Sequence, residues 1–209
     1  MVINAIIYFG LYMLLLQVWD SFKKRGQVAQ LVKGVRPSHV GWALVMLTTT
    51  LIALSVMSWA ATSLAPWLQW GWFTALTDQS GSMLSAGSTG RHTVPKPVLV
   101  AFYAAFVLAI PLMVLVEERL FRSGAERRST MALVGMACLF GLAHMVVGVP
   151  VFAAVALIPA GLWLTKIYRS AYTRTGSAEM ALFEAGRVHL ANNMIAVALG
   201  ALAYMTLTR

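Results

Sequence analysis

The chain has 209 residues, of which 59% are hydrophobic and only 11% are charged, and its net charge at pH 7 is +9. Soluble domains carry about 25% charged residues, so this composition excludes an ordinary soluble domain and indicates a membrane protein. The positive charge does not indicate nucleic-acid binding, because the basic residues form short clusters between apolar segments and not one continuous basic face.

Six apolar segments approach the length that a helix needs to cross a membrane. A hydrocarbon core of about 30 Å takes roughly 20 helical residues, since each residue rises about 1.5 Å. The segments cover residues 2–19, 40–64, 98–116, 131–147, 151–167 and 188–207. The sequence therefore predicts an all-α fold, a polytopic transmembrane bundle of about six spanning helices.

We expect residues 1–209 to form a single membrane domain, with two helices and a loop in residues 1–97 and a helical core in residues 98–209. Residues 65–97 begin with tryptophans, as membrane interfaces often do, and continue into Gly- and Ser-rich sequence that predicts an outer loop. The pair Gly81-Ser82 could suggest a rhomboid-type serine protease. No partnered membrane histidine lies near it in the sequence, so this interpretation is disfavoured.

The distribution of basic residues predicts the orientation. With six crossings, all but three of the 16 Lys and Arg residues fall on one side, the exceptions being Arg91, Lys96 and Arg209. The positive-inside rule assigns the basic side to the cytoplasm, so both termini should face outward. His39 and Glu184 are expected at the membrane interface or in water.

Several ionisable or strongly polar residues lie within or beside the apolar segments. A charged side chain there costs at least about 2.5 kcal/mol on insertion scales, so it persists mainly where it pairs, faces a watery cavity or takes part in chemistry. The set consists of Glu117, Glu118, Arg122, His144, His189 and Asn193.

Helical spacing predicts how the acidic residues are arranged. Glu118 and Arg122 are four residues apart and lie on one face, which favours an ion pair. Glu117 points about 100° away from Glu118 and is the freer carboxylate. It is therefore the candidate general base.

The same spacing recurs in two other pairs, His189 with Asn193 and Phe140 with His144. Helix lengths place Glu117 and His189 at similar depths, so we expect them to meet. His144 lies deeper, and a tilt of its helix or a kink at Gly141 would be needed to bring it to the others.

In chain order these residues read Glu117-Glu118-x-x-x-Arg122, Phe140-x-x-x-His144 and His189-x-x-x-Asn193. The series resembles the signature of the CPBP family of intramembrane proteases. That family includes the type II CAAX prenyl endopeptidases and bacteriocin-processing enzymes, and its bacterial members are often labelled abortive-infection proteins. The resemblance covers the chain from about residue 101 to the end and does not extend to the first two helices.

The resemblance implies a hydrolase, an intramembrane endopeptidase whose cavity opens toward the cytoplasmic half of a bacterial cytoplasmic membrane. Glu117 would activate a water molecule, and His144 would orient that water or Glu117. His189 and Asn193 would stabilise the oxyanion. The substrate would be a peptide or a membrane protein.

In the same resemblance, Glu118 and Arg122 would hold the base in place, with Phe140 as structural support. The family pattern usually has glycine directly after its arginine, whereas here Ser123 precedes Gly124. This departure leaves the local turn in doubt more than the chemistry.

No cofactor is expected, although two histidines and a glutamate could also bind zinc. The ligands would come from three separate helices without a His-Glu-x-x-His pair, so the sequence favours the metal-free mechanism.

Taken singly, each motif also has a structural explanation as an ion pair, a packed histidine or an interhelical hydrogen bond. Two other functions stay open. One is a non-catalytic scaffold or immunity factor of the same fold that binds a membrane partner. The other is a proton-coupled carrier that uses Glu117 and His189. The lipid bilayer is the expected surrounding, nucleic acid is not an expected partner, and the sequence does not indicate the oligomeric state.

Overall fold

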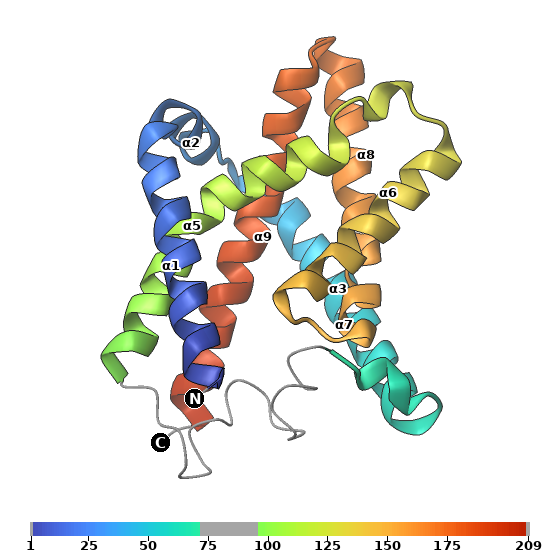
Figure 1. The fold of residues 1–209 in the computed structure, drawn as a ribbon. Helices are drawn as coiled ribbons and strands as arrows, with labels where there is room; N and C mark the ends of the chain where they lie inside the picture. Colours follow the sequence, from blue (N-terminus) through green and yellow to red (C-terminus); the bar gives the residue numbers. More distant parts are fainter. Residues whose placement is uncertain (1, 72–95, 208–209) are drawn as a thin grey trace.

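The computed structural model describes residues 2–71 and 96–207, and these residues form helices and their connections without any strand. The all-α prediction is confirmed. The helices pack into an elongated bundle (Figure 1). α9 lies near its centre, in contact with α3, α5 and α8.

Within the described residues, six helices have at least 14 residues. They are α1 (Val2–Lys23), α3 (Pro37–Ser63), α5 (Lys96–Arg122), α6 (Thr130–Ala143), α8 (Ile158–Thr175) and α9 (Ala178–Leu207). Shorter elements connect them, namely α2 (Arg25–Lys33), η1 (Pro66–Gln69), η3 (Ala125–Arg127), η4 (His144–Val147) and α7 (Val151–Ala156).

Four helical stretches among the described residues are long and apolar enough to cross a membrane. They are Pro37–Ser63, Val100–Arg127, Thr130–Val147 and Val151–Thr175. Of the about six membrane spans that the sequence predicts, four therefore meet the requirement of length and hydropathy. α9 is not among them, and its first half carries Glu184, Arg187 and His189, so it is not uniformly apolar.

The outer surface of the bundle supports a membrane environment. Large apolar side chains are exposed along the helices, among them Ile52 and Trp59 on α3, Leu108 on α5 and Leu202 on α9. Water would make this exposure unfavourable, whereas lipid tails accommodate it.

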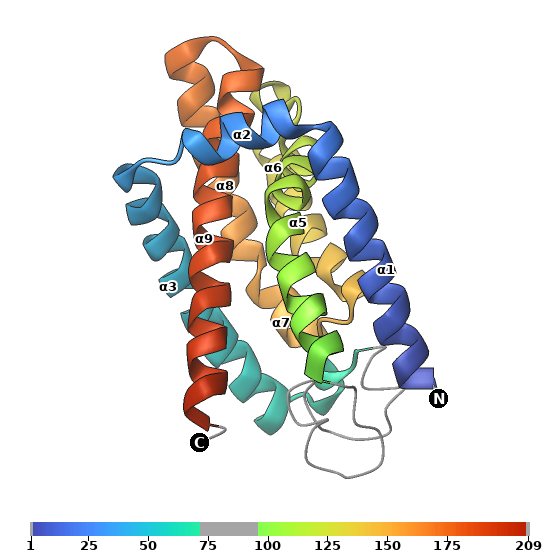
Figure 2. The same cartoon turned by 90° about the vertical axis from the view of Figure 1, so that its left-hand side faces the viewer.

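The two ends of the bundle differ in their charge. α2 and the turn between α8 and α9 lie at one end, whereas α1 begins and α9 ends at the other (Figure 2). The first of these ends carries the basic clusters around Lys23, Lys33 and Arg174, and we call it the basic end. The outer loop around Gly81, Ser82, Arg91 and His92 lies outside the described residues, as does Arg209.

The helices approach one another closely where one of them carries a glycine, because glycine has no side chain. A Cβ on Gly141 of α6 would collide with the carbonyl oxygen of Ala154 on α7. Gly161 of α8 packs against Ala137 and Phe140 of α6, so a Cβ there would lie 3.1 Å from the Ala137 Cα. Small residues at such contacts are typical of helix pairs in membranes, and they bring α6 and α8 together beside Phe140.

We expect Gly141→Ala to destabilise the protein by about 1–3 kcal/mol, because the added methyl group meets backbone that cannot move aside. Gly135→Ala on the same helix is the matched control. Nothing lies within 4 Å of its added Cβ, so the better helix propensity of alanine should leave the protein equally stable or slightly more stable. Thermal unfolding in detergent measures both variants, and equal melting temperatures would contradict the packing described for α6.

Candidate functional site

The charged residues of the third predicted segment lie in the last two turns of α5. The helix ends at Arg122, and Gly124 then adopts a left-handed conformation with a φ of 78°. Only glycine takes this conformation without strain, so the turn depends on Gly124 and not on the residue directly after Arg122. The displaced glycine therefore still ends the helix.

Glu118 and Arg122 form the ion pair that their spacing predicts. Arg122 Nη1 lies 3.5 Å from Glu118 Oε1, and each side chain is only 1% exposed. The Arg122 guanidinium also lies 4.4 Å from the centre of the Phe140 ring, and its Nη2 donates a hydrogen bond to the carbonyl oxygen of Gly161. Arg122 thus connects α5 with α6 and α8.

His189 on α9 lies between the two glutamates. Its Nδ1 is 2.8 Å from Glu118 Oε1, and its Nε2 is 3.6 Å from Glu117 Oε2. The imidazole is buried, as is Glu118, whereas the Glu117 side chain is 26% exposed. The predicted meeting of Glu117 with His189 is confirmed.

The hydrogen bond from His189 to Glu118 determines which nitrogen of the ring carries the proton. An ionised carboxylate can only accept hydrogen bonds, so Nδ1 must carry the proton that it donates to Glu118. In the neutral ring Nε2 then has a free lone pair on the side of Glu117. The sequence did not predict this hydrogen bond, because the two residues are 71 positions apart and no spacing rule connects them.

Several buried atoms of this cluster have no hydrogen-bond partner among residues 2–71 and 96–207. They are Glu117 Oε2, Glu118 Oε2, Arg122 Nε and Arg122 Nη1. Buried polar atoms are nearly always paired with protein or water, and leaving them unpaired costs about 1–3 kcal/mol each. The cluster therefore has the capacity to bind water close to both carboxylates.

His144 lies at the end of α6, beside Phe140. α6 ends at Ala143, and His144 begins the 3-10 turn η4. His144 Nδ1 donates a hydrogen bond of 2.8 Å to the carbonyl oxygen of Phe140, which leaves Nε2 free. The Phe140 ring lies 5.0 Å from the His144 ring and 5.7 Å from the His189 ring, measured between centroids. Phe140 thus packs against both imidazoles.

The predicted contacts of His144 and Asn193 with the rest of the site are looser. Within the described part of the chain, no hydrogen bond or ion pair joins His144 to Glu117 or Glu118. Asn193 is partly buried and accepts a hydrogen bond of 3.4 Å from its neighbour Asn192, and none between Asn193 and His189 is recorded. The structure therefore brings Glu117, Glu118, Arg122 and His189 into one cluster, with Phe140 packed on it.

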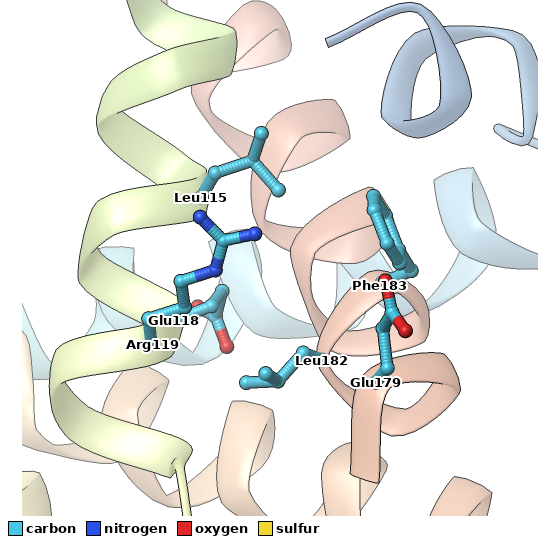
Figure 3. A pocket seen from close by; sticks show the side chains of 6 residues that line it. All are labelled: Leu115, Glu118, Arg119, Glu179, Leu182 and Phe183. Carbon is cyan, nitrogen blue, oxygen red and sulfur yellow. The ribbon is translucent and has the colours of Figure 1, made fainter. Parts of the chain in front are cut away.

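A cavity of about 220 Å³ lies between α5 and α9 beside this cluster. Figure 3 shows side chains of the two helices facing each other across it, with the carboxylate of Glu118 pointing into the space. Its walls are formed by Leu115, Glu118, Arg119, Glu179, Leu182 and Phe183. The cavity thus adjoins the buried side chain of Glu118.

Within residues 2–71 and 96–207, no three His, Cys, Asp or Glu side chains are arranged so that they could hold a metal ion.

A second charged cluster joins α3 to α9, and the expectation for its residues was wrong. His39 is only 4% exposed, and its Nε2 lies 3.1 Å from Glu184 Oε2. Arg187 also binds Glu184. Burial raises the pKa of the Glu184 carboxyl, but the hydrogen bond and charge of His39 and the charge of Arg187 more than offset it, so the pKa lies below its usual value. These residues hold helices together at the basic end.

Comparison of the chain with protein-family models, with curated proteins and with solved structures found no match.

Proposed function

We propose that this chain is an intramembrane endopeptidase of the CPBP type, which hydrolyses a peptide bond in a membrane-associated or lipid-modified protein. The observation that carries the proposal is the position of His189, a buried imidazole with a different glutamate at each of its nitrogens. Two carboxylates beside one ring would add little to the stability of a helical bundle, because burying such charges is costly.

Glu117 is the proposed general base. It is the more exposed of the two carboxylates, and its Oε2 has no hydrogen-bond partner in the part of the chain that the structure describes. The separation of 3.6 Å between Oε2 and His189 Nε2 is longer than a direct hydrogen bond and suits a water that contacts both atoms. Glu117 would take a proton from this water as the oxygen attacks the peptide carbonyl, and would return it to the leaving amine.

Glu118 and Arg122 have positioning roles in this proposal. Glu118 would hold the imidazole through Nδ1, so that the lone pair of Nε2 is directed at the water. Arg122 would offset the charge of Glu118. His144 Nε2 would accept a hydrogen bond from the water and so orient it. The Asn193 amide would donate to the developing oxyanion, a contribution of about 3 kcal/mol.

We further propose six crossings, with α1 and α9 completing the four stretches that meet the length and hydropathy requirement. The basic end would then face the cytoplasm of a bacterial cell. No cofactor takes part, so chelators should leave cleavage unchanged. Recovery of activity on adding Zn²⁺ after chelation would instead favour a metalloprotease.

A non-catalytic scaffold or immunity factor is the second candidate. It is favoured by the absence, among the described residues, of any hydrogen bond or ion pair from His144 to the glutamates. The Glu118–Arg122–His189 network could then serve only to fix the helices. A scaffold needs Arg122 and Glu118 to hold the helices together, but it does not need a reactive carboxylate at Glu117. An endopeptidase does need that carboxylate, so the two functions differ in whether they depend on Glu117.

The proposed function is tested by comparing protein termini in membranes from cells that express the wild-type chain and from cells that express Glu117→Ala. Enrichment of new N-termini followed by mass spectrometry should find at least one terminus that requires Glu117. Asp20→Asn, an exposed carboxylate at the end of α1, is the control and should give the wild-type set. Identical termini in all three membranes would favour the scaffold.

A further inference from the structure

A second and larger cavity, of about 490 Å³, opens between α3, α8 and α9 at the basic end. Its walls come from the first turns of α3, the last turns of α8 and the first turns of α9. Cationic side chains (Arg36, Lys166 and Arg174) and a tryptophan pair (Trp42 and Trp163) line it. The endopeptidase proposal makes no use of this cleft, and none of the seven motif residues lines it.

The charge of the cleft is not balanced. Arg174 lies 3.8 Å from Glu184, and the same carboxylate is already bound by His39 and Arg187. Among the residues that the structure describes, no carboxylate forms an ion pair with Arg36 or Lys166. The cleft therefore has two exposed cations that are available to an anion.

The other half of the cleft is apolar and aromatic. The Trp42 and Trp163 rings lie 5.6 Å apart, and the Lys166 ammonium lies 4.8 Å from the centre of the Trp163 ring. Ile167, Met180 and Val188 extend this wall. Tryptophans concentrate at the headgroup level of a membrane, and α3 begins only five residues before Trp42, which is about 8 Å along the helix.

We propose that this cleft binds the phosphate headgroup of an anionic phospholipid. Arg36 and Lys166 would contact the phosphate, and the glycerol and first acyl carbons would lie against Trp42 and Trp163. A small inorganic anion would use only the cationic half, whereas a lipid matches both halves and lies at the right depth. Basic pockets between membrane helices on the cytoplasmic side recognise such headgroups through the same combination of charge and depth.

The test uses the full-length chain in an uncharged detergent, with lipid binding followed by native mass spectrometry. Phosphatidylglycerol should bind at least about tenfold more tightly than phosphatidylcholine of the same acyl length, because the choline cation is repelled by the cleft. The double variant Arg36→Gln/Lys166→Gln should lose roughly thirtyfold in phosphatidylglycerol affinity, given the usual contribution of each basic residue near an anionic headgroup.

The control is Lys33→Gln/Arg169→Gln, which removes the same charge from exposed positions at the same end but outside the cleft. It should bind phosphatidylglycerol within about twofold of the wild type. An equal loss in both double variants would overturn the proposal in favour of general charge attraction. Competition by inorganic phosphate at the same concentration as the lipid would overturn the lipid as ligand.

One measurement on the wild-type chain keeps the proposal falsifiable if a variant fails to fold. Raising the salt concentration should weaken phosphatidylglycerol binding, because Arg36 and Lys166 are exposed and their attraction to phosphate is screened. Affinity that does not change with salt would contradict binding through these two cations. None of these measurements depends on proteolysis.

Discussion

Glu117→Gln is expected to lower the rate of peptide cleavage by about 10²–10⁴-fold while leaving the melting temperature of the protein unchanged. Glutamine has the shape of glutamate, so the packing of α5 stays the same, but its amide cannot take a proton from water. Glu117 makes no direct hydrogen bond to His189, so little stabilising energy is lost. Single-turnover kinetics on a substrate found by terminal labelling measures the rate.

The matched control for Glu117→Gln is Asp20→Asn. Asp20 is about half exposed, and among the described residues its one ion pair is with exposed Lys23, so its loss should change neither rate nor stability. Cleavage at the wild-type rate by purified Glu117→Gln would refute Glu117 as the base. A large fall in melting temperature in that variant would show that Glu117 has a structural role.

Glu118→Leu is expected to destabilise the protein by about 3–5 kcal/mol, because it leaves the Arg122 guanidinium buried without its counter-charge. It also removes the acceptor of His189 Nδ1 and should therefore abolish cleavage. Thermal unfolding in detergent and the cleavage assay report the two effects separately.

The double variant Glu118→Leu/Arg122→Leu distinguishes the two roles of Glu118. Removing both charges should restore most of the stability, since an apolar pair can replace a buried ion pair with little loss. Cleavage should stay absent, because His189 still has no partner at Nδ1. A single variant as stable as the wild type, or a double variant that recovers activity, would contradict the arrangement of α5 and α9.

Hydropathy and helical spacing were enough to predict the fold class and part of the site. The apolar segments mark where the long helices lie, and the spacing of Glu118 and Arg122 places both on one face of α5. Depth along α5 and α9 also predicted that Glu117 meets His189. These features are local, or follow from helix length, and so can be derived from sequence.

Contacts between distant helices could not be predicted in this way. The hydrogen bond from His189 to Glu118 and the contact of Arg122 with Phe140 depend on how α5, α6 and α9 rotate against one another. The pairing of His39 with Glu184 was missed because both residues lie next to helix ends, where exposure is the usual expectation. The close approach of α7 to α6 at Gly141 also depends on how distant segments pack and could not be predicted.

The central claim is that Glu117 and His189 make a buried water reactive, and cleavage in water enriched with ¹⁸O tests it most directly. Purified wild-type protein, with a chelator present, should place one ¹⁸O atom in the new C-terminal carboxylate of the substrate. Glu117→Gln should place none above the uncatalysed background. Unlabelled product from the wild type, or equal labelling by the two proteins, would contradict hydrolysis by a water that Glu117 activates.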